Sequence, residues 1–398
     1  MRKINRCFFV APVLACTVSM SLPAQAATPA IYNLGTLGGS ASYGRALNAS
    51  GEVTGFSYIA GDTSFHAFLY TGPGGTMVDL GTFPGGVTSH GYGINAVGQV
   101  VGDSGGSPVG GDFIYSGVPG SGGMMYNLGT LGGNTGLALA VNASGQVTGW
   151  SGTQIGGPFH AFLYSGVPGA GGAMVDLGTL GGSSEGNAIN DNGQVAGDSV
   201  TAGGVAQHAF LYSGIPGNGG AMADLGSLGG NSFAFGINSA GQVVGKSLTS
   251  GGTHAFLYTG TPGAGGAMAD LGPGVAEAIN DQGDVVGWNG SRAFIYVGTP
   301  GHDGHMIDLN DWFKANNPTE AAKWTLAAAW GVTDTGLIAG SGTYNDGPGG
   351  LSDGDRAFLL DASALVVPEP GGIVLMGIGA LGMLWWWRMC NRFAVEEK

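Results

Sequence analysis

The chain has 398 residues, of which 83 are glycine and 17 are proline, and its formal net charge is −14. This much glycine and proline is typical of low-complexity chains, but 43% of the residues are hydrophobic and the glycines recur at fixed offsets, which favours an ordered repeat. The negative charge excludes a nucleic-acid-binding protein, because such a protein needs stripes of lysine and arginine.

The first 26 residues have the three parts of a secretory signal peptide. Basic residues come first, an apolar run at 7–22 follows, and alanines then form the expected cleavage site: Ala24, Ala26 and Ala27. We therefore expect the Sec machinery to export the chain and signal peptidase to cut it before Ala27. A lipidated Cys16 is the alternative start. Because two of the three cysteines lie in this segment and the third is Cys390, we expect an exported body without a disulfide.

A unit of about 47 residues, in the size range of a propeller blade, repeats from residue 31 to residue 361. Its clearest mark is the leucine of an Asp/Asn-Leu-Gly motif, altered in the last copy: Leu34, Leu80, Leu128, Leu177, Leu225, Leu271 and Leu309. Each unit holds four short apolar segments, too short for helices and rich in the residues typical of strands. A lone unit cannot bury its apolar faces and must stack on its neighbours. The sequence therefore predicts one all-β domain over residues 27–361, a β-propeller of seven four-stranded blades; six blades or an open β-solenoid are the alternatives.

The most regular joint is a turn near the end of each unit. An asparagine stands three residues before a glycine in six units: Asn48, Asn95, Asn142, Asn190, Asn238 and Asn280. Asparagine at the first position and glycine at the fourth are preferred in a type I turn, because asparagine bonds its own backbone and glycine accepts a positive φ. The pattern predicts a hairpin in each of these units.

The two ends of the repeat complement each other. The first unit lacks the Ala-Phe-Leu-Tyr segment that precedes its Asn-Leu-Gly motif, and the last unit ends with a spare copy at Ala357–Leu360. A propeller removes its exposed strand edges by closing on itself. We therefore expect the C-terminal strand to pair with the first unit and to close the ring.

Several strings in the repeat resemble catalytic motifs without fitting them. Gly102-Asp103-Ser104 matches a serine-hydrolase signature, but Gly-x-Ser fills the same slot in other units and no matching histidine motif precedes it. Four histidines open Ala-Phe-Leu-Tyr segments about one unit apart: His66, His160, His208 and His254. We expect them to pack or to bond turns rather than to form one site.

Two stretches depart from the repeat. His302-Asp303-Gly304-His305 has side chains that can bind a metal, although this spacing alone is weak support for a site. In the stretch Asn310–Trp330 we expect a short helix with Asn310 or Asp311 near its N-cap, serving as a ligand lid or as a cap over a blade. Neither stretch shows convergent carboxylates, so we assign no catalytic, cofactor-binding or metal-binding residue. Binding of Ca²⁺ by the thinly spread acidic residues stays open.

The repeat resembles the HAF-repeat family of bacterial extracellular proteins. The resemblance covers about residues 31–360 and rests on motifs such as His160-Ala161-Phe162, Asp176-Leu177-Gly178 and Ile189-Asn190-Asp191. It implies an extracellular location, whereas the biochemical role of the family is itself obscure.

The C-terminus resembles the PEP-CTERM sorting signal, which exosortases of Gram-negative bacteria recognise. A linker at 362–370 contains the motif, an apolar run at 371–387 follows it, and a tail at 388–398 carries arginines: Val367, Pro368, Glu369, Pro370, Arg388 and Arg392. Seventeen helical residues would rise about 26 Å, enough to cross a thin bilayer, and the arginines would hold the tail in the cytoplasm. The resemblance implies a temporary transmembrane helix and processing by an exosortase-type enzyme.

These patterns predict an exported protein that passes through an inner-membrane intermediate to the cell surface or the extracellular space. The expected role is binding or structural, with a glycan or matrix ligand; an association with exopolysaccharide or biofilm is implied by the resemblance alone. We expect no enzymatic activity. The alternative is an extracellular propeller enzyme, a polysaccharide lyase or hydrolase, with its site in the central funnel.

Overall fold

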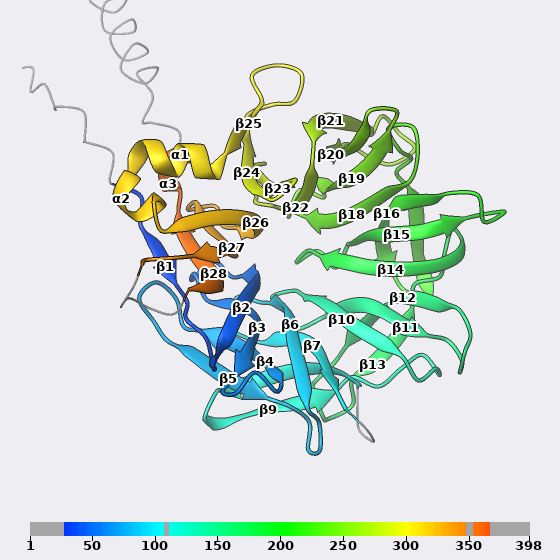
Figure 1. The fold of residues 1–398 in the computed structure, drawn as a ribbon. Coiled ribbons are helices and arrows are strands. Elements are labelled where there is room, and N and C mark those ends of the chain that lie inside the picture. The colour runs from blue at the N-terminus through cyan, green and yellow to red at the C-terminus, as the bar shows by residue number, and fades with distance from the viewer. Residues whose placement is uncertain (1–27, 107–110, 348–352, 367–398) are drawn as a thin grey trace, which may run out of the picture.

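The computed structural model describes residues 28–106, 111–347 and 353–366. The expected signal peptide, the Pro-Glu-Pro motif, the apolar run and the basic tail lie outside these residues. The described chain forms seven four-stranded antiparallel sheets that stand in a ring, as Figure 1 shows along the ring axis. This confirms the seven-bladed β-propeller and excludes the six-bladed ring and the open β-solenoid.

Six blades use four consecutive strands each, and the first strand of each lies nearest the axis (Figure 1). Blade 1 consists of β2 (Gly38–Leu47), β3 (Val53–Ile59), β4 (Phe65–Tyr70) and β5 (Met77–Gly81). Blade 2 consists of β6 (Thr88–Ile94), β7 (Val100–Gly105), β8 (Gly111–Val118) and β9 (Ser121–Asn127). Blade 3 consists of β10 (Gly136–Val141), β11 (Val147–Gly152), β12 (Phe159–Ser165) and β13 (Ala173–Asp176).

The next blades follow the same order. Blade 4 consists of β14 (Gly181–Ile189), β15 (Val195–Thr201), β16 (Gln207–Ile215) and β17 (Asn218–Asp224). Blade 5 consists of β18 (Ser232–Ile237), β19 (Val243–Thr249), β20 (Gly252–Thr259) and β21 (Ala267–Pro273). Blade 6 consists of β22 (Val275–Ile279), β23 (Val285–Asn289), β24 (Arg292–Val297) and β25 (His305–Asp308).

The seventh blade joins the two ends of the chain. It consists of β26 (Trp324–Val332), β27 (Leu337–Tyr344), β28 (Gly354–Asp361) and, as its outer strand, β1 (Ile31–Asn33). The pairing of β1 with β28 is antiparallel and places Asn33 opposite Phe358. The expected closure of the ring by the C-terminal strand is therefore confirmed. The blade that is closed is the last one, because β28 also pairs with β27.

The hydrophobic core lies between neighbouring blades. One cluster joins Ala67 and Leu69 of blade 1 to Val100 and Phe113 of blade 2, and each further junction has a cluster of the same kind. The phenylalanine of the Ala-Phe-Leu-Tyr segment, or its equivalent, is fully buried in every blade. Because each apolar face is covered by the next blade, the sheets are stable only as a ring.

The stretch after β25 caps the outside of the ring rather than the channel. It contains α1 (Leu309–Asn316) and α2 (Pro318–Ala321), with Leu309 and Phe313 buried in the core between blades 6 and 7. The N-cap of α1 is Asp308, whose side chain accepts hydrogen bonds from the backbone N–H groups of Asn310 and Asp311, so these two residues lie close to the N-cap, as expected. A carboxylate accepts these bonds well, which explains why the helix begins directly after Asp308.

After β28 the described chain ends in the short helix α3 (Ser363–Val366), with Val366 buried. Across the described ranges, we find no helix of the length and apolarity that a membrane span requires. The expected span at 371–387 lies beyond them.

Candidate functional site

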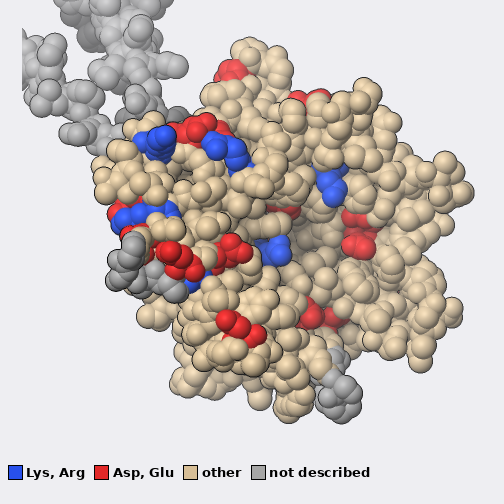
Figure 2. Space-filling model, viewed as in Figure 1, with Lys and Arg blue, Asp and Glu red and all other residues tan. Residues whose placement is uncertain are grey.

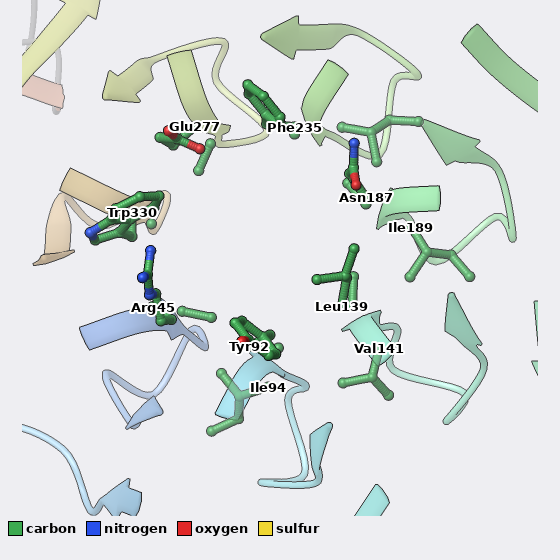
Figure 3. A pocket seen from close by; sticks show the side chains of 18 of the residues that line it. Arg45, Tyr92, Ile94, Leu139, Val141, Asn187, Ile189, Phe235, Glu277 and Trp330 are labelled. Atoms are coloured by element: carbon green, nitrogen blue, oxygen red, sulfur yellow. The ribbon is translucent and has the colours of Figure 1, made fainter. Parts of the chain in front are cut away.

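A cavity of about 580 Å³ occupies the central channel. It is lined by the inner strand of every blade, and Figure 3 shows their side chains converging from all directions on the axis. Positions along these strands can be counted back from the turn asparagine, whose place Thr333 takes in blade 7. Counted in this way, the lining falls into two layers with different chemistry.

The first layer stands three residues before the turn and differs in every blade. We call it the bulge ring: Arg45, Tyr92, Leu139, Asn187, Phe235, Glu277 and Trp330. In each blade the pairing of the inner strand shifts by one residue here, so this residue is the extra one of a β-bulge. A bulge re-aims a side chain that the ladder would otherwise hold. The fold thus directs one side chain of each blade into the channel.

The residues on either side of the bulge ring are glycine or alanine in all seven blades. Close packing at the axis explains this. A Cβ atom on Gly93 would lie 2.8 Å from the carbonyl oxygen of Leu139 in the next blade, and one on Gly44 would lie 2.9 Å from that of Gly340. Near the axis only the bulge-ring positions therefore have room for large side chains.

The second layer stands one residue before the turn and is aliphatic throughout: Leu47, Ile94, Val141, Ile189, Ile237, Ile279 and Val332. A wall of such side chains offers no hydrogen bonds to a ligand. The side chains that can form hydrogen bonds with a ligand therefore lie in the bulge ring, or beyond it at the end of the channel away from the turns. We call that end of the channel the mouth.

A further pair of positions surrounds the mouth. The residue five before the turn stands opposite the middle residue of the Gly-x-Ser slot, and we call these pairs the outer tier: Tyr43–Phe56, His90–Asp103, Leu137–Trp150, Glu185–Asp198, Phe233–Lys246, Val275–Trp288 and Ala328–Ser341. Like the bulge ring, these positions vary strongly between blades. Leu137, Trp150 and Glu185 also line the cavity. Figure 2 shows charged atoms of both signs around the hollow at the centre of this face.

Two carboxyl groups face each other in blade 4. Burial, and then the charge of Asp198, raise the pKa of Glu185 to about 7. Burial also raises the pKa of Asp198 to about 6, although Gln207 and the Nδ2 atom of Asn187 donate hydrogen bonds to it, the latter at 2.9 Å. Near neutral pH the Glu185 carboxyl is therefore about half protonated, while the Asp198 carboxyl is mostly ionised.

The other charged groups of the mouth rest against aromatic rings. The guanidinium carbon of Arg45 lies 4.3 Å from the ring centre of Trp330, and the Nζ atom of Lys246 lies 4.8 Å from that of Phe233. Glu277 accepts a hydrogen bond of 2.8 Å from the Nε1 atom of Trp288. Burial raises the pKa of Glu277 in spite of this bond.

Blade 2 adds a histidine and an acid. The Nδ1 atom of His90 lies 2.9 Å from a carboxylate oxygen of Asp103. Burial, and then the charge of Asp103, raise the pKa of Tyr92 to about 12. The mouth thus combines aromatic faces, hydrogen-bonding groups and charges of both signs, which is the usual composition of a site for a small polar ligand.

The turn asparagines lie at the opposite end of the inner strands and do not face the mouth. Each begins the turn after its strand, as the bond of 2.9 Å from the Gly51 N–H to the Asn48 carbonyl illustrates. The side chain of Asn142 shows their common role. Its Oδ1 atom accepts from the N–H groups of Ser144 and Gln146, and its Nδ2 atom donates to the side chain of Gln146.

The same Nδ2 atom also donates to the turn carbonyl of the next blade. These bonds of 3.0 to 3.2 Å run from blade 1 to blade 7, and we call the set the turn ring: Asn48 to Asn95, Asn95 to Asn142, Asn142 to Asn190, Asn190 to Asn238, Asn238 to Asn280, and Asn280 to Thr333. Thr333 has no side-chain amide, so among the described residues no such bond leads from it back to Asn48. The turn ring is therefore structural, and it is open at the junction where the chain ends meet.

The repeated histidines are also held within their own blades. The Nδ1 atoms of His66, His160, His208 and His254 lie 2.8 to 3.0 Å from the aspartate of the Asp-Leu-Gly motif in the same blade. This matches the expectation that they form no shared site.

The remaining sequence candidates do not form a site either. The side chains of His302 and Asp303 are 86% and 70% exposed and lie 3.9 Å apart. In the described ranges no group of three His, Cys, Asp or Glu residues is arranged to hold a metal ion. Ser104 is buried, and its hydroxyl accepts from the Phe83 N–H and donates to the Thr88 carbonyl, so it fastens a loop.

The bulge ring is the feature that motif searching missed. The sequence places Trp330 at the end of the inserted stretch Asn310–Trp330, whereas in the structure it belongs to β26 and lines the channel. A signal was present: with the units aligned on their turns, the residue three before the turn changes in every unit while its neighbours stay small. Comparison with protein-family models finds no match, and comparison with curated proteins finds none either.

Proposed function

We propose that the chain is an exported surface protein that binds a glycan in the mouth of its channel. The bulge ring carries this proposal. Seven blades built to one plan each place a different side chain at the one position that the β-bulge aims at the axis. A purely structural repeat has no need of such variety, whereas a ligand without seven-fold symmetry requires it.

The chemistry of the mouth favours a sugar as the ligand. Aromatic rings stack on the apolar C–H faces of pyranose rings, and side-chain amides and carboxylates bond the hydroxyl groups. The bulge ring and the outer tier supply the rings: Tyr43, Phe56, Tyr92, Trp150, Phe233, Phe235, Trp288 and Trp330. The cavity volume lies within the usual range for ligand sites, roughly 300–1,000 Å³.

A glycan array probed with the purified chain, with and without Ca²⁺, tests this proposal. We expect binding to a restricted set of oligosaccharides that is lost in a Phe235→Ala, Trp330→Ala double variant with an unchanged melting temperature. Absence of binding to any glycan, or equal binding by the double variant, would remove the mouth as a glycan site.

The surface location is proposed from the ends of the chain. The signal-peptide pattern supports export, and the likeness to HAF-repeat proteins and to PEP-CTERM substrates supports sorting by an exosortase-type enzyme. Replacing Pro368, Glu369 and Pro370 by Ala-Gln-Ala leaves the apolar run intact. In this variant we expect full-length protein to accumulate in the inner membrane of a native host. For the unchanged chain we expect the N-terminal sequence of surface material to begin near Ala27. Unchanged display of the variant would leave a plain C-terminal anchor.

Glycan hydrolysis is the second candidate, and the carboxyl pair of blade 4 favours it. A hydrolase needs one protonated and one ionised carboxyl group beside the bond it cleaves, and Glu185 and Asp198 have pKa values of about 7 and about 6. New reducing ends, produced from a bound glycan by the wild type but not by Glu185→Gln, would establish hydrolysis. If Glu185→Gln binds the glycan as the wild type does and neither protein cleaves it, the function is binding without hydrolysis.

A further inference from the structure

Arg45 is the one arginine of the bulge ring, and it has no ionic partner in the described parts of the chain. Its guanidinium lies over Trp330 at 4.3 Å and near Phe56 at 5.8 Å from the ring centres. Its Nε atom is buried and, within the described residues, donates to no hydrogen-bond acceptor. By contrast Arg292, on the outside of blade 6, reaches the carboxylates of both Asp308 and Asp311.

An arginine in this setting is costly to the folded chain alone. Burial lowers the pKa of Arg45, while the nearby groups Tyr92, Glu277 and Tyr43 act in the opposite direction. An arginine stays protonated even so, and the buried Nε donor of this half-buried side chain loses hydration that no group in the described chain replaces. The acid whose charge acts on Arg45 is Glu277 of blade 6, but its carboxylate accepts from Trp288 and makes no ion pair with Arg45.

The side chain is oriented towards the ligand space. Figure 3 shows Arg45 reaching from β2 alongside Trp330 and the channel, with Glu277 on the other side of the tryptophan. The aromatic ring supports one face of the guanidinium plane, which leaves the edge with its N–H donors for a ligand. A planar edge of this kind pairs with a carboxylate through two parallel hydrogen bonds.

A second cation stands across the mouth. Lys246 of blade 5 lies over Phe233 and Phe235 at 4.8 and 5.4 Å, and no ion pair of Lys246 occurs in the described ranges. The acids of the mouth are partly neutralised near neutral pH, because the pKa values of Glu185 and Asp198 are raised. The mouth therefore offers cationic donors to a ligand in a chain whose net charge is −14.

We infer that Arg45 binds the carboxylate of an acidic sugar, so that the glycan bound in the mouth contains uronic acid residues. This inference rests on the proposed glycan binding and specifies its ligand class. The aromatic rings receive the sugar ring, Arg45 receives its carboxylate, and Lys246 supports the negative charge of a neighbouring residue of the same chain.

Titration calorimetry with tetragalacturonate and tetramannuronate, and with their methyl esters, tests the inference on the full chain. We expect each free acid to bind at least ten-fold more tightly than its ester, with an affinity that falls as salt is raised. Arg45→Gln should lower the affinity for the acids to that for the esters, and Arg45→Lys should retain part of the difference. Arg292→Gln is the matched control and should bind as the wild type does.

The outcomes separate the two proposals. Equal affinity of the wild type for acid and ester, or an unchanged preference in Arg45→Gln, overturns the uronate inference while glycan binding stands. Tighter binding of a sulfated oligosaccharide than of the uronates also overturns it. If no oligosaccharide binds in any form, the proposed function itself fails. The acid–ester comparison on the wild type remains decisive even if Arg45→Gln does not fold.

Discussion

The turn ring and the bulge ring are three residues apart in each blade, yet they follow opposite rules. At the turn ring the side chain is asparagine in six blades, and its amide links each blade to the next. At the bulge ring no two blades carry the same side chain. The difference shows how this repeat separates its tasks. Positions that hold neighbouring blades together are uniform, and positions released from the ladder by a bulge are free to diversify.

Asp112 is an exception to the uniformity of the structural positions. It stands directly before the buried phenylalanine of blade 2, where the other six blades have alanine. It is 2% exposed, both carboxylate oxygens lack a hydrogen-bond partner within the described residues, and burial raises its pKa to about 8. The folded chain thus keeps a proton that the unfolded chain releases above about pH 4, so this group makes stability fall as the pH rises from about 4 to about 8. We expect Asp112→Asn to be more stable than the wild type by about 3–5 kcal/mol at pH 8 and nearly equal to it at pH 4, measured by denaturant unfolding.

The matched control restores the usual residues. In the next blade Gly136 stands where four other blades have a serine, and a Cβ there would lie close to the Asp112 carboxylate. The double change Asp112→Ala, Gly136→Ser should remove the same pH dependence. Parallel stability curves for the wild type and Asp112→Asn between pH 4 and pH 8 would contradict the expected protonation.

At the turn ring, Asn142→Ala removes four hydrogen bonds, one of them between blades. Because the bond between blades is buried and the other three are partly buried, we expect a loss of about 2–4 kcal/mol and a lower melting temperature. Leu139→Ala, three residues earlier in the bulge ring, is the control and should cost about 1 kcal/mol, since Leu139 is only half-buried. Equal losses at the two positions would abolish the contrast between the rings.

At the mouth, Trp150→Ala should act on binding rather than on folding. Its half-buried ring lines the cavity, and loss of a stacking surface costs about 1–2 kcal/mol, or about ten-fold in glycan affinity. Tyr126→Ala, on the outer strand β9, removes an aromatic ring far from the channel axis and is the control. An equal loss of affinity in both variants would place the glycan elsewhere.

The smallest effect is expected where the turn ring is open. Thr333→Asn supplies the missing amide, which can donate to the turn carbonyl of Asn48 as its counterparts do. We expect a gain of about 1 kcal/mol, measured as a higher denaturation midpoint. Thr335→Asn, in the same turn, should give no gain. A destabilised Thr333→Asn variant would show that the junction between the chain ends is packed differently from the others.

The sequence predicts the fold well because its regularities are local. Turn chemistry at the asparagines and the spacing of the Asp/Asn-Leu-Gly motifs are enough to count the blades, and the spare segment at Ala357–Leu360 predicts the closure. The bulge is less visible. Its clearest trace is Gly55 and its equivalents, where a Cβ would lie 1.8–2.2 Å from a carbonyl of the inner strand. In a sequence this rich in glycine, the need for glycine at these positions cannot be recognised until the strand register is known. The carboxyl pair of Glu185 and Asp198 is not visible in the sequence, because the two residues lie on different strands and become neighbours only when β14 pairs with β15.

The pairing of β1 with β28 has a consequence for how the protein folds. Ile31 lies opposite Leu360, so this contact joins residues that are far apart in the chain and requires β28 to have been made. Such a high contact order predicts slow completion of folding. Until residue 354 has been made, blade 7 lacks its central pairing and the core around Leu34, Phe68 and Leu359 is incomplete. Incomplete chains therefore present open strand edges and apolar surface to proteases and to one another, so the closing strand also distinguishes finished chains from truncated ones.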